Sequence, residues 1–244
     1  MITGPNIDEL ERETEERTRR NYGHWHDALE ELLNAYLAAF RAVGAFEVTE
    51  ENRQQQLWLR LVSLCFNSLK WAMVLWKTGY YTQALILARS VFENWLVCMD
   101  TIAHGDTVDS LLSGGRLPTF KEMADRSLSS ELQQWFYGPS ASSNVSVYGF
   151  LSTFSHPRFR ASSTQVDPQG HTLRVGPHYD ETLAIVAYYY VAQAAVKMSE
   201  FATRMVPREN QEDVVRTHLQ PGVDRANECV DEALTKAKAL LDQS

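Results

Sequence analysis

The sequence predicts an all-α fold, an antiparallel helical bundle with a small β-hairpin insertion, built as a single domain over residues 1–244. Apolar residues recur every three or four positions along most of the chain, which is the period of amphipathic helices. The break at Thr78-Gly79 is so short that the helices on either side of it should be antiparallel neighbours. Two short alternating segments flank a Pro-then-Gly turn and predict the hairpin at residues 160–176.

The first long helix should end near Gly44. Its apolar face is marked by residues at helical spacing, namely Tyr22, Trp25, Leu29, Leu32, Tyr36, Phe40 and Val43. Acidic and basic residues alternate in the segment before it. Residues 1–21 are therefore predicted to be a frayed or extended N-terminal helix.

The second helix should span about Glu50–Lys77 and the third about Tyr80–Ala103. The stretch from Leu57 to Trp76 is apolar enough to resemble a membrane span. Polar residues nevertheless recur along one side of it, and charges at the centre of a span are costly. We therefore expect a bundle helix with one solvated edge, and no membrane segment.

Shorter helices are expected between residues 105 and 155. Capping-box spacing at Thr119–Glu122, repeated at Ser130–Gln133, predicts two helix starts, and Pro157 should end a helix over 144–155.

The C-terminal part should form three more helices. One runs from Asp180 to Met205, one opens at Pro207, and one spans Val223–Leu241. Pro221-Gly222 is predicted to separate the last two.

The net charge of −8 argues against broad electrostatic binding to nucleic acid or anionic membranes, so RNA binding is not supported by the charge. The three cysteines, Cys65, Cys98 and Cys229, are far apart and odd in number, which favours a reducing compartment. No signal peptide is evident. We expect a cytoplasmic protein.

Two polar clusters stand within apolar helical sequence and are the best candidates for a site. The first holds Arg89 and Glu93, which lie with Asp100 on one side of a helical wheel. The second is the segment Tyr148–Arg158. The candidate site residues are Arg89, Glu93, Tyr148, Ser152, Ser155, His156 and Arg158.

Two interpretations of these clusters stay open. In the structural one, Arg89 and Glu93 form an internal ion pair whose hydrogen bonds are completed by Ser155 or Tyr148. In the functional one, Arg89 holds an anion and His156 donates or accepts a proton.

No metal site and no cofactor are expected. The His24-Trp25-His26 segment has two potential ligands, but residues i and i+2 point to different faces of a helix. No carboxylate is a convincing third ligand in the sequence.

The Ala88-Arg89-Ser90-Val91-Phe92-Glu93 segment and the later Tyr148…Leu151-Ser152…Ser155-His156 segment resemble a broad group of bacterial all-helical proteins that share a domain of unknown function. Over residues 50–200, Arg89, Glu93, Tyr148, Ser152 and His156 correspond to its recognisable positions. The resemblance implies the helical fold and no agreed chemistry.

A more distant similarity is to the HEPN superfamily of helical bundles, many of which are metal-independent ribonucleases of bacterial toxin and defence systems. Their signature is an arginine and a histidine with four to six residues between them. Arg19 with His24, and Arg20 with His26, have this spacing. The resemblance implies that His156 would take the 2′-hydroxyl proton while Arg89 or Arg158 stabilises the phosphorane.

The leading prediction is a non-enzymatic binding or interaction module of unknown ligand, with a homodimer through the terminal helices as an expected assembly. The alternatives are the HEPN-like ribonuclease and a sensor of small anionic metabolites. Whether the protein is an enzyme stays open at this point.

Overall fold

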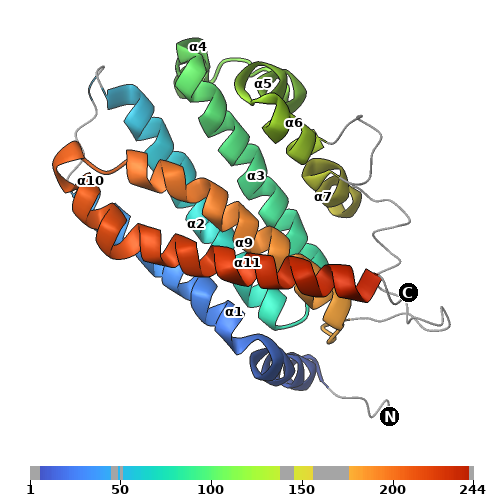
Figure 1. Cartoon of the computed structure of the whole chain (residues 1–244). Helices are drawn as coiled ribbons and strands as arrows, with labels where there is room; N and C mark the ends of the chain where they lie inside the picture. The colour runs from blue at the N-terminus through green and yellow to red at the C-terminus, as the bar shows by residue number, and fades with distance from the viewer. Residues whose placement is uncertain (1–5, 45–48, 50–51, 138–145, 156–175, 242–244) are drawn as a thin grey trace.

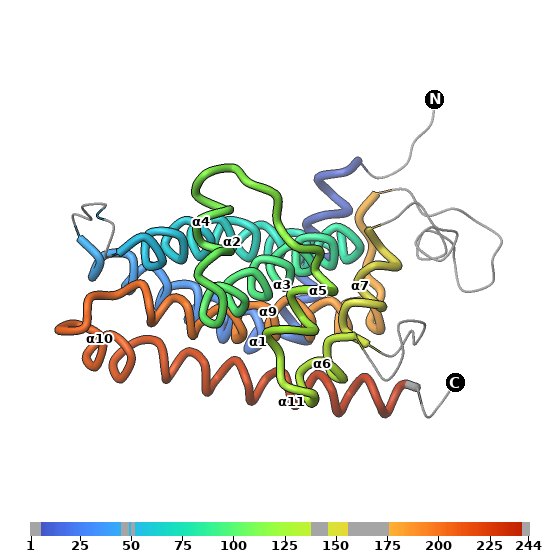
Figure 2. The backbone as a smooth tube through the Cα atoms, turned by 90° about the horizontal axis from the view of Figure 1, so that it is seen from above, coloured from blue at the N-terminus to red at the C-terminus, as the bar shows by residue number. Residues whose placement is uncertain are grey.

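Five long helices form the bundle in the computed structural model, which describes residues 6–44, 49, 52–137, 146–155 and 176–241. They are α1 (Ile7–Val43), α2 (Arg53–Lys77), α3 (Tyr81–Ala103), α9 (Glu181–Arg204) and α11 (Gln220–Leu241). Helix α9 packs against each of the other four, and Figures 1 and 2 show how these helices run beside one another. The described residues contain no strand, which confirms the all-α prediction for them. The hairpin predicted at 160–176 lies outside these residues except for Gly176, and it stays a prediction.

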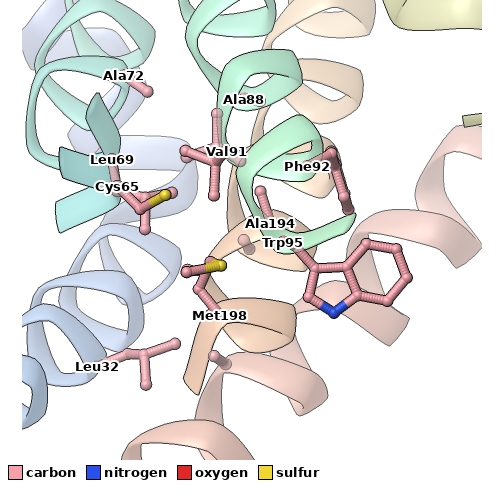
Figure 3. Close-up of a cluster of buried hydrophobic side chains, with 14 of the residues drawn as sticks. Leu32, Cys65, Leu69, Ala72, Ala88, Val91, Phe92, Trp95, Ala194 and Met198 are labelled. Atoms are coloured by element: carbon pink, nitrogen blue, oxygen red, sulfur yellow. The ribbon is translucent and has the colours of Figure 1, made fainter. Parts of the chain in front are cut away.

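The core lies where α1, α2, α3 and α9 meet. Figure 3 shows Leu32 of α1, Leu69 of α2, Val91 of α3 and Met198 of α9 converging, and each of these side chains is fully buried. The three cysteines are free and buried. The apolar faces of α1 and α11 also pack inside the chain, against each other and against α9. These faces are occupied within the chain, and the predicted homodimer stays a prediction.

The tight turn between α2 and α3 depends on Gly79. Its φ is +92°, a left-handed conformation that favours glycine. A Cβ atom at this position would lie 2.6 Å from the backbone oxygen of His178. Gly79 therefore lets the segment that leads into α9 pack directly on the α2–α3 turn.

Helix α1 is one continuous element with a kink at Tyr22, whose φ of −139° and ψ of 29° are not helical. The half before the kink is the predicted N-terminal extension, and it is helical from Ile7 onward. Polar contacts hold it on the bundle: Glu15 accepts a hydrogen bond from Lys77 at 2.7 Å, and Glu11 accepts one from Tyr80 at 2.8 Å.

The C-terminal part differs from the prediction at Pro221-Gly222. Helix α10 (Arg208–Val214) continues through a π-helical turn, η2 (Val215–Leu219), straight into α11. Pro221 directly follows this π-helical turn. It has no N–H to donate to the preceding turn, so the continuous helix accommodates it at a local irregularity. Gly222 lies where a Cβ atom would be 3.1 Å from Leu32 Cα. The pair therefore marks a close approach of two helices and no chain break.

Four short helices lie along one side of α3, as Figure 1 shows. They are α4 (Gly105–Ser113), α5 (Phe120–Ser127), α6 (Ser130–Tyr137) and α7 (Val147–Ser155). The capping box of Thr119 and Glu122 is confirmed at the start of α5. At the start of α6 the capping hydroxyl is that of Ser129, which accepts from Leu132 N at 3.3 Å, so the prediction was wrong by one residue.

No described helix combines the length and hydrophobicity needed to cross a bilayer.

Candidate functional site

The first candidate cluster joins α3 to α7. Arg89 Nε donates a hydrogen bond to Glu93 Oε1 at 2.8 Å, so the expected contact between residues i and i+4 is present. Arg89 Nη2 donates to Tyr148 Oη at 3.0 Å. The guanidinium carbon also lies 5.0 Å from the centre of the Tyr148 ring, within the range of a cation–π interaction. We refer to Arg89, Glu93 and Tyr148 as the Arg89 cluster.

Aromatic packing fixes the position of Tyr148. Its ring centroid lies 5.4 Å from that of Phe136 and 5.1 Å from that of Tyr137, both at the end of α6. Ser146 starts α7, because its hydroxyl accepts a hydrogen bond from Gly149 N at 3.0 Å. Local capping and the α6 aromatics thus place the phenol over Arg89.

The Arg89 cluster is mostly removed from water but is not saturated with hydrogen bonds. The Arg89 side chain is 13% exposed and that of Glu93 is 22% exposed. Of five guanidinium N–H donors, the contacts within the described residues use two. The hydroxyls of Tyr137 and Ser152 are buried and have no hydrogen-bond partner in the described part of the chain.

Tyr137 was not among the predicted site residues. Burial is the main cause that raises the pKa of its phenol, and the neighbouring Tyr148 raises it further. The phenol is therefore neutral near pH 7 and able to donate a hydrogen bond. The Trp135-Phe136-Tyr137 run before Gly138-Pro139 was the sequence signal that could have indicated it.

The remaining predicted residues have different outcomes. Ser152 lies one turn after Tyr148 on α7, on the same face of that helix. Ser155 donates its hydroxyl hydrogen bond to Leu151 O at 3.2 Å, so Tyr148 and not Ser155 completes the hydrogen bonds of the ion pair. His156 and Arg158 lie outside the described residues, and their approach to Arg89 stays a prediction.

Asp100 does not join Arg89, although the two share one side of the α3 wheel. Its carboxylate is fully buried and accepts from Arg126 Nε at 2.7 Å and from Arg126 Nη2 at 2.5 Å. It also accepts from Thr107 Oγ1 at 2.6 Å and from the hydroxyl of Ser127. Thr107 is on α4, while Arg126 and Ser127 are on α5, so this Asp100 cluster fastens two short helices to α3.

A third polar group lines a pocket of about 170 Å³ at the kink of α1. Arg19, His26, Asp27 and Glu30 are on its walls, with Lys77 of α2 opposite. Ligand atoms of His26, Asp27 and Glu30 all lie within 4.8 Å of one another. Two carboxylates thus lie near His26, whereas the sequence offered no convincing third ligand for a His24–His26 pair.

His24 points elsewhere, as the helical geometry predicted. Its Nε2 lies 2.8 Å from Glu232 Oε2 of α11, which also accepts from Trp25 Nε1 at 2.8 Å. Burial alone would raise the pKa of Glu232, but these hydrogen bonds lower it to about 2. His24 therefore belongs to a contact between helices, and only His26 faces the pocket.

Compared with known proteins by family model, by sequence against curated proteins and by fold against solved structures, the chain has no match, so its function has to be inferred from its own geometry.

Proposed function

We propose that this protein is an intracellular, non-enzymatic binding module that recognises an anionic group, such as a carboxylate or phosphate, at the Arg89 cluster. Two buried hydroxyls without a partner among the described residues carry the proposal: that of Tyr137, whose ring packs against Tyr148, and that of Ser152, one turn after Tyr148 on α7. Arg89, which bonds to Tyr148, has donors that no described residue uses. This unites the predicted binding module with the predicted sensor of anionic metabolites.

The energetics of burial support a ligand here. Leaving a buried hydroxyl without a hydrogen bond costs about 1–3 kcal/mol. A carboxylate or phosphate is an acceptor that suits such hydroxyls and the N–H groups of Arg89 that no described residue uses. Glu93 holds the Nε side of the guanidinium, so the ligand would approach from the Nη side.

A thermal-shift screen with small carboxylates, phosphates and nucleotides tests the proposal. A compound that raises the Tm of the wild-type protein should have no effect on the Tyr137→Phe/Ser152→Ala double variant. That variant should keep the fold, because neither hydroxyl has a partner to lose within the described residues.

Ser155→Ala is the matched control on the same helix. Its hydroxyl bonds to Leu151 O, so the ligand response should survive this change. A screen without any shift, or a shift that persists in the double variant, would overturn the proposal.

A HEPN-like ribonuclease is the second candidate, favoured by one observation. Arg19 and His26 line the same pocket of α1, with six residues between them. The other candidate catalytic pair for a ribonuclease is His156 together with either Arg89 or Arg158. Against it, Asp27 and Glu30 make the α1 pocket unfavourable for a phosphodiester.

Incubation of single-stranded RNA with the purified protein in EDTA tests this candidate. Cleavage that His156→Ala abolishes would support the His156 mechanism, whereas cleavage lost only in His26→Ala would place the activity at α1. Intact RNA would exclude the ribonuclease.

A further inference from the structure

We propose that the outer face of helix α2 is a docking surface for an acidic amphipathic helix of a partner protein. On this face the side chain of Trp71 is 63% exposed and that of Leu64 is 53% exposed. The two residues are seven positions apart, so they lie two turns from each other on one side of the helix. They therefore belong to one surface and are not scattered apolar residues, which would need no explanation.

The spacing on this face is that of a seam between two helices. Outward-facing residues follow one another at steps of four, three, four and three positions, and we call them the α2 seam: Arg60, Leu64, Asn67, Trp71 and Val74. The first four are exposed and Val74 is partly exposed. Helices that pair along their length meet through residues with this alternation, because it follows one side of a helix. The α2 seam therefore favours a helix as its occupant.

The charge of α2 determines which kind of helix fits. Its 25 residues include no acidic one, in a chain whose net charge is −8. Near the ends of α2, Arg53 and Lys77 are paired with carboxylates of other helices at 3.2 Å and 2.7 Å. Arg60 and Lys70, on the exposed middle part, have no ion-pair partner among the described residues. These two cations select a partner with carboxylates beside its apolar side chains.

Two other occupants fit this face less well. If the α2 seams of two copies met, Arg60 and Lys70 of both chains would be brought together, and like charges repel. An anionic membrane would attract these cations, but it would repel a protein whose net charge is −8. Two apolar side chains are also a small anchor for a bilayer, whereas one buried tryptophan can supply much of the energy of a protein interface.

The probe that tests the proposal is a labelled synthetic peptide of about three heptads, with leucine at the seam positions and glutamate at the flanking positions. A twin peptide has lysine in place of every glutamate. We expect the purified full chain to bind the glutamate peptide saturably in fluorescence anisotropy and to leave the lysine peptide unbound. The affinity for the glutamate peptide should fall as salt is added, because salt screens exposed charges.

Two variants locate the binding on α2. Trp71→Ala should weaken binding of the glutamate peptide by about thirtyfold or more, because a tryptophan buried on binding is a typical hot spot. Lys70→Glu should weaken it by about tenfold, and together with Arg60→Glu it should transfer binding to the lysine peptide. All three side chains are exposed, so these changes should leave the fold intact.

Ile7→Ala and Lys238→Glu are the matched controls. Ile7 is 60% exposed at the start of α1, and Lys238 is an exposed lysine on α11. They repeat the loss of an exposed apolar side chain and the reversal of a charge outside the α2 seam, and neither should change the affinity.

Absence of saturable binding, equal binding of both peptides, or undiminished binding in Trp71→Ala would each overturn the proposal. A wild-type dimer that Trp71→Ala dissociates would show that a second copy is the occupant and would overturn the assignment of a partner protein. Binding to vesicles of phosphatidylserine and phosphatidylcholine that Trp71→Ala abolishes would overturn it in favour of a lipid surface.

Discussion

Two ion-paired clusters on α3, about three turns apart, differ in how completely they are satisfied. The Asp100 carboxylate is fully buried and accepts four hydrogen bonds, from Arg126, Thr107 and Ser127. The Asp100 carboxylate therefore has its acceptor sites filled, although His104 Nδ1, 3.5 Å from Asp100 Oδ1, is buried without a hydrogen-bond partner among the described residues.

The Arg89 guanidinium makes two hydrogen bonds within the described residues, and the hydroxyls of Tyr137 and Ser152, which flank its partner Tyr148, have no partner among them. A group whose hydrogen-bonding sites are filled has no capacity left for a ligand, whereas the Arg89 guanidinium has unused donors. This contrast separates a structural cluster from a candidate binding site on the same helix.

The largest effect should come from removing the cation of the Asp100 cluster. Arg126→Ala would leave a fully buried carboxylate without its charged partner. The expected loss is about 3–5 kcal/mol in the free energy of unfolding, measured by urea denaturation. The Arg126→Met/Asp100→Asn double variant should recover part of this loss, because the buried charge is gone. A loss below about 1 kcal/mol in Arg126→Ala would show that Asp100 is not a structural anchor.

Arg89→Ala should cost less, about 1–3 kcal/mol, because Glu93 is 22% exposed and can be hydrated after its partner is removed. It should also abolish the response to any anionic ligand found in the screen, whereas Arg126→Ala should keep that response at temperatures where the variant is folded. If Arg89→Ala were the more destabilising of the two variants, the Arg89 cluster would be the structural anchor and the comparison would be reversed.

Acid should weaken the Asp100 cluster in a defined pH range. Burial by itself raises the pKa of Asp100, but the hydrogen bonds from Arg126, Ser127 and Thr107 outweigh it and lower the pKa below its usual range. A carboxylate whose pKa is lower in the folded protein than in the unfolded chain stabilises the fold at pH values above its unfolded-state pKa, about 3.9. This contribution is lost as the pH falls through the folded-state pKa.

The difference in unfolding free energy between wild type and Asp100→Asn should therefore be constant from about pH 7 to pH 5 and shrink below about pH 4. Urea denaturation of both proteins at four pH values between pH 7 and pH 3 measures this difference. A difference that grows as the pH falls would contradict the lowered pKa.

Much of the fold could be predicted because its signals are local. Helical spacing and the break at Thr78-Gly79 indicated α1, α2, α3 and α9 with nearly correct ends. Pro221-Gly222 misled the prediction because a continuous helix can accommodate proline at a π-helical turn and uses glycine where two helices approach closely. The close approach at Gly222 is to Leu32, a residue distant in sequence.

In the candidate site, too, contacts within one helix could be predicted and contacts between helices could not. Arg89 and Glu93 could be paired from sequence because both lie on one helix, one turn apart. Asp100 shares their side of the wheel but finds Arg126 on another helix, and no sequence spacing encodes that contact. The kink at Tyr22 lies next to Gly23 in the wall of the α1 pocket, but one glycine within a helical pattern does not by itself specify a kink.

The smallest expected effect concerns two neighbouring tyrosines. The hydroxyl of Tyr148 accepts a hydrogen bond, whereas that of Tyr137 has no partner among the described residues. Tyr148→Phe removes the acceptor of an Arg89 hydrogen bond and should cost about 0.5–1.5 kcal/mol, while the ring keeps its place over the guanidinium. Tyr137→Phe removes a buried hydroxyl that has no partner in the described part of the chain, so it should be neutral or stabilising.

The two substitutions delete the same atom from rings whose centroids are 5.1 Å apart, so the difference between them reports only on hydrogen bonding. Urea denaturation of both variants, without ligand, measures it. An equal loss in Tyr137→Phe would mean that its hydroxyl is already satisfied within the protein. The Arg89 cluster would then be as complete as the Asp100 cluster, and the case for a ligand between α3 and α7 would lose the observation on which it rests.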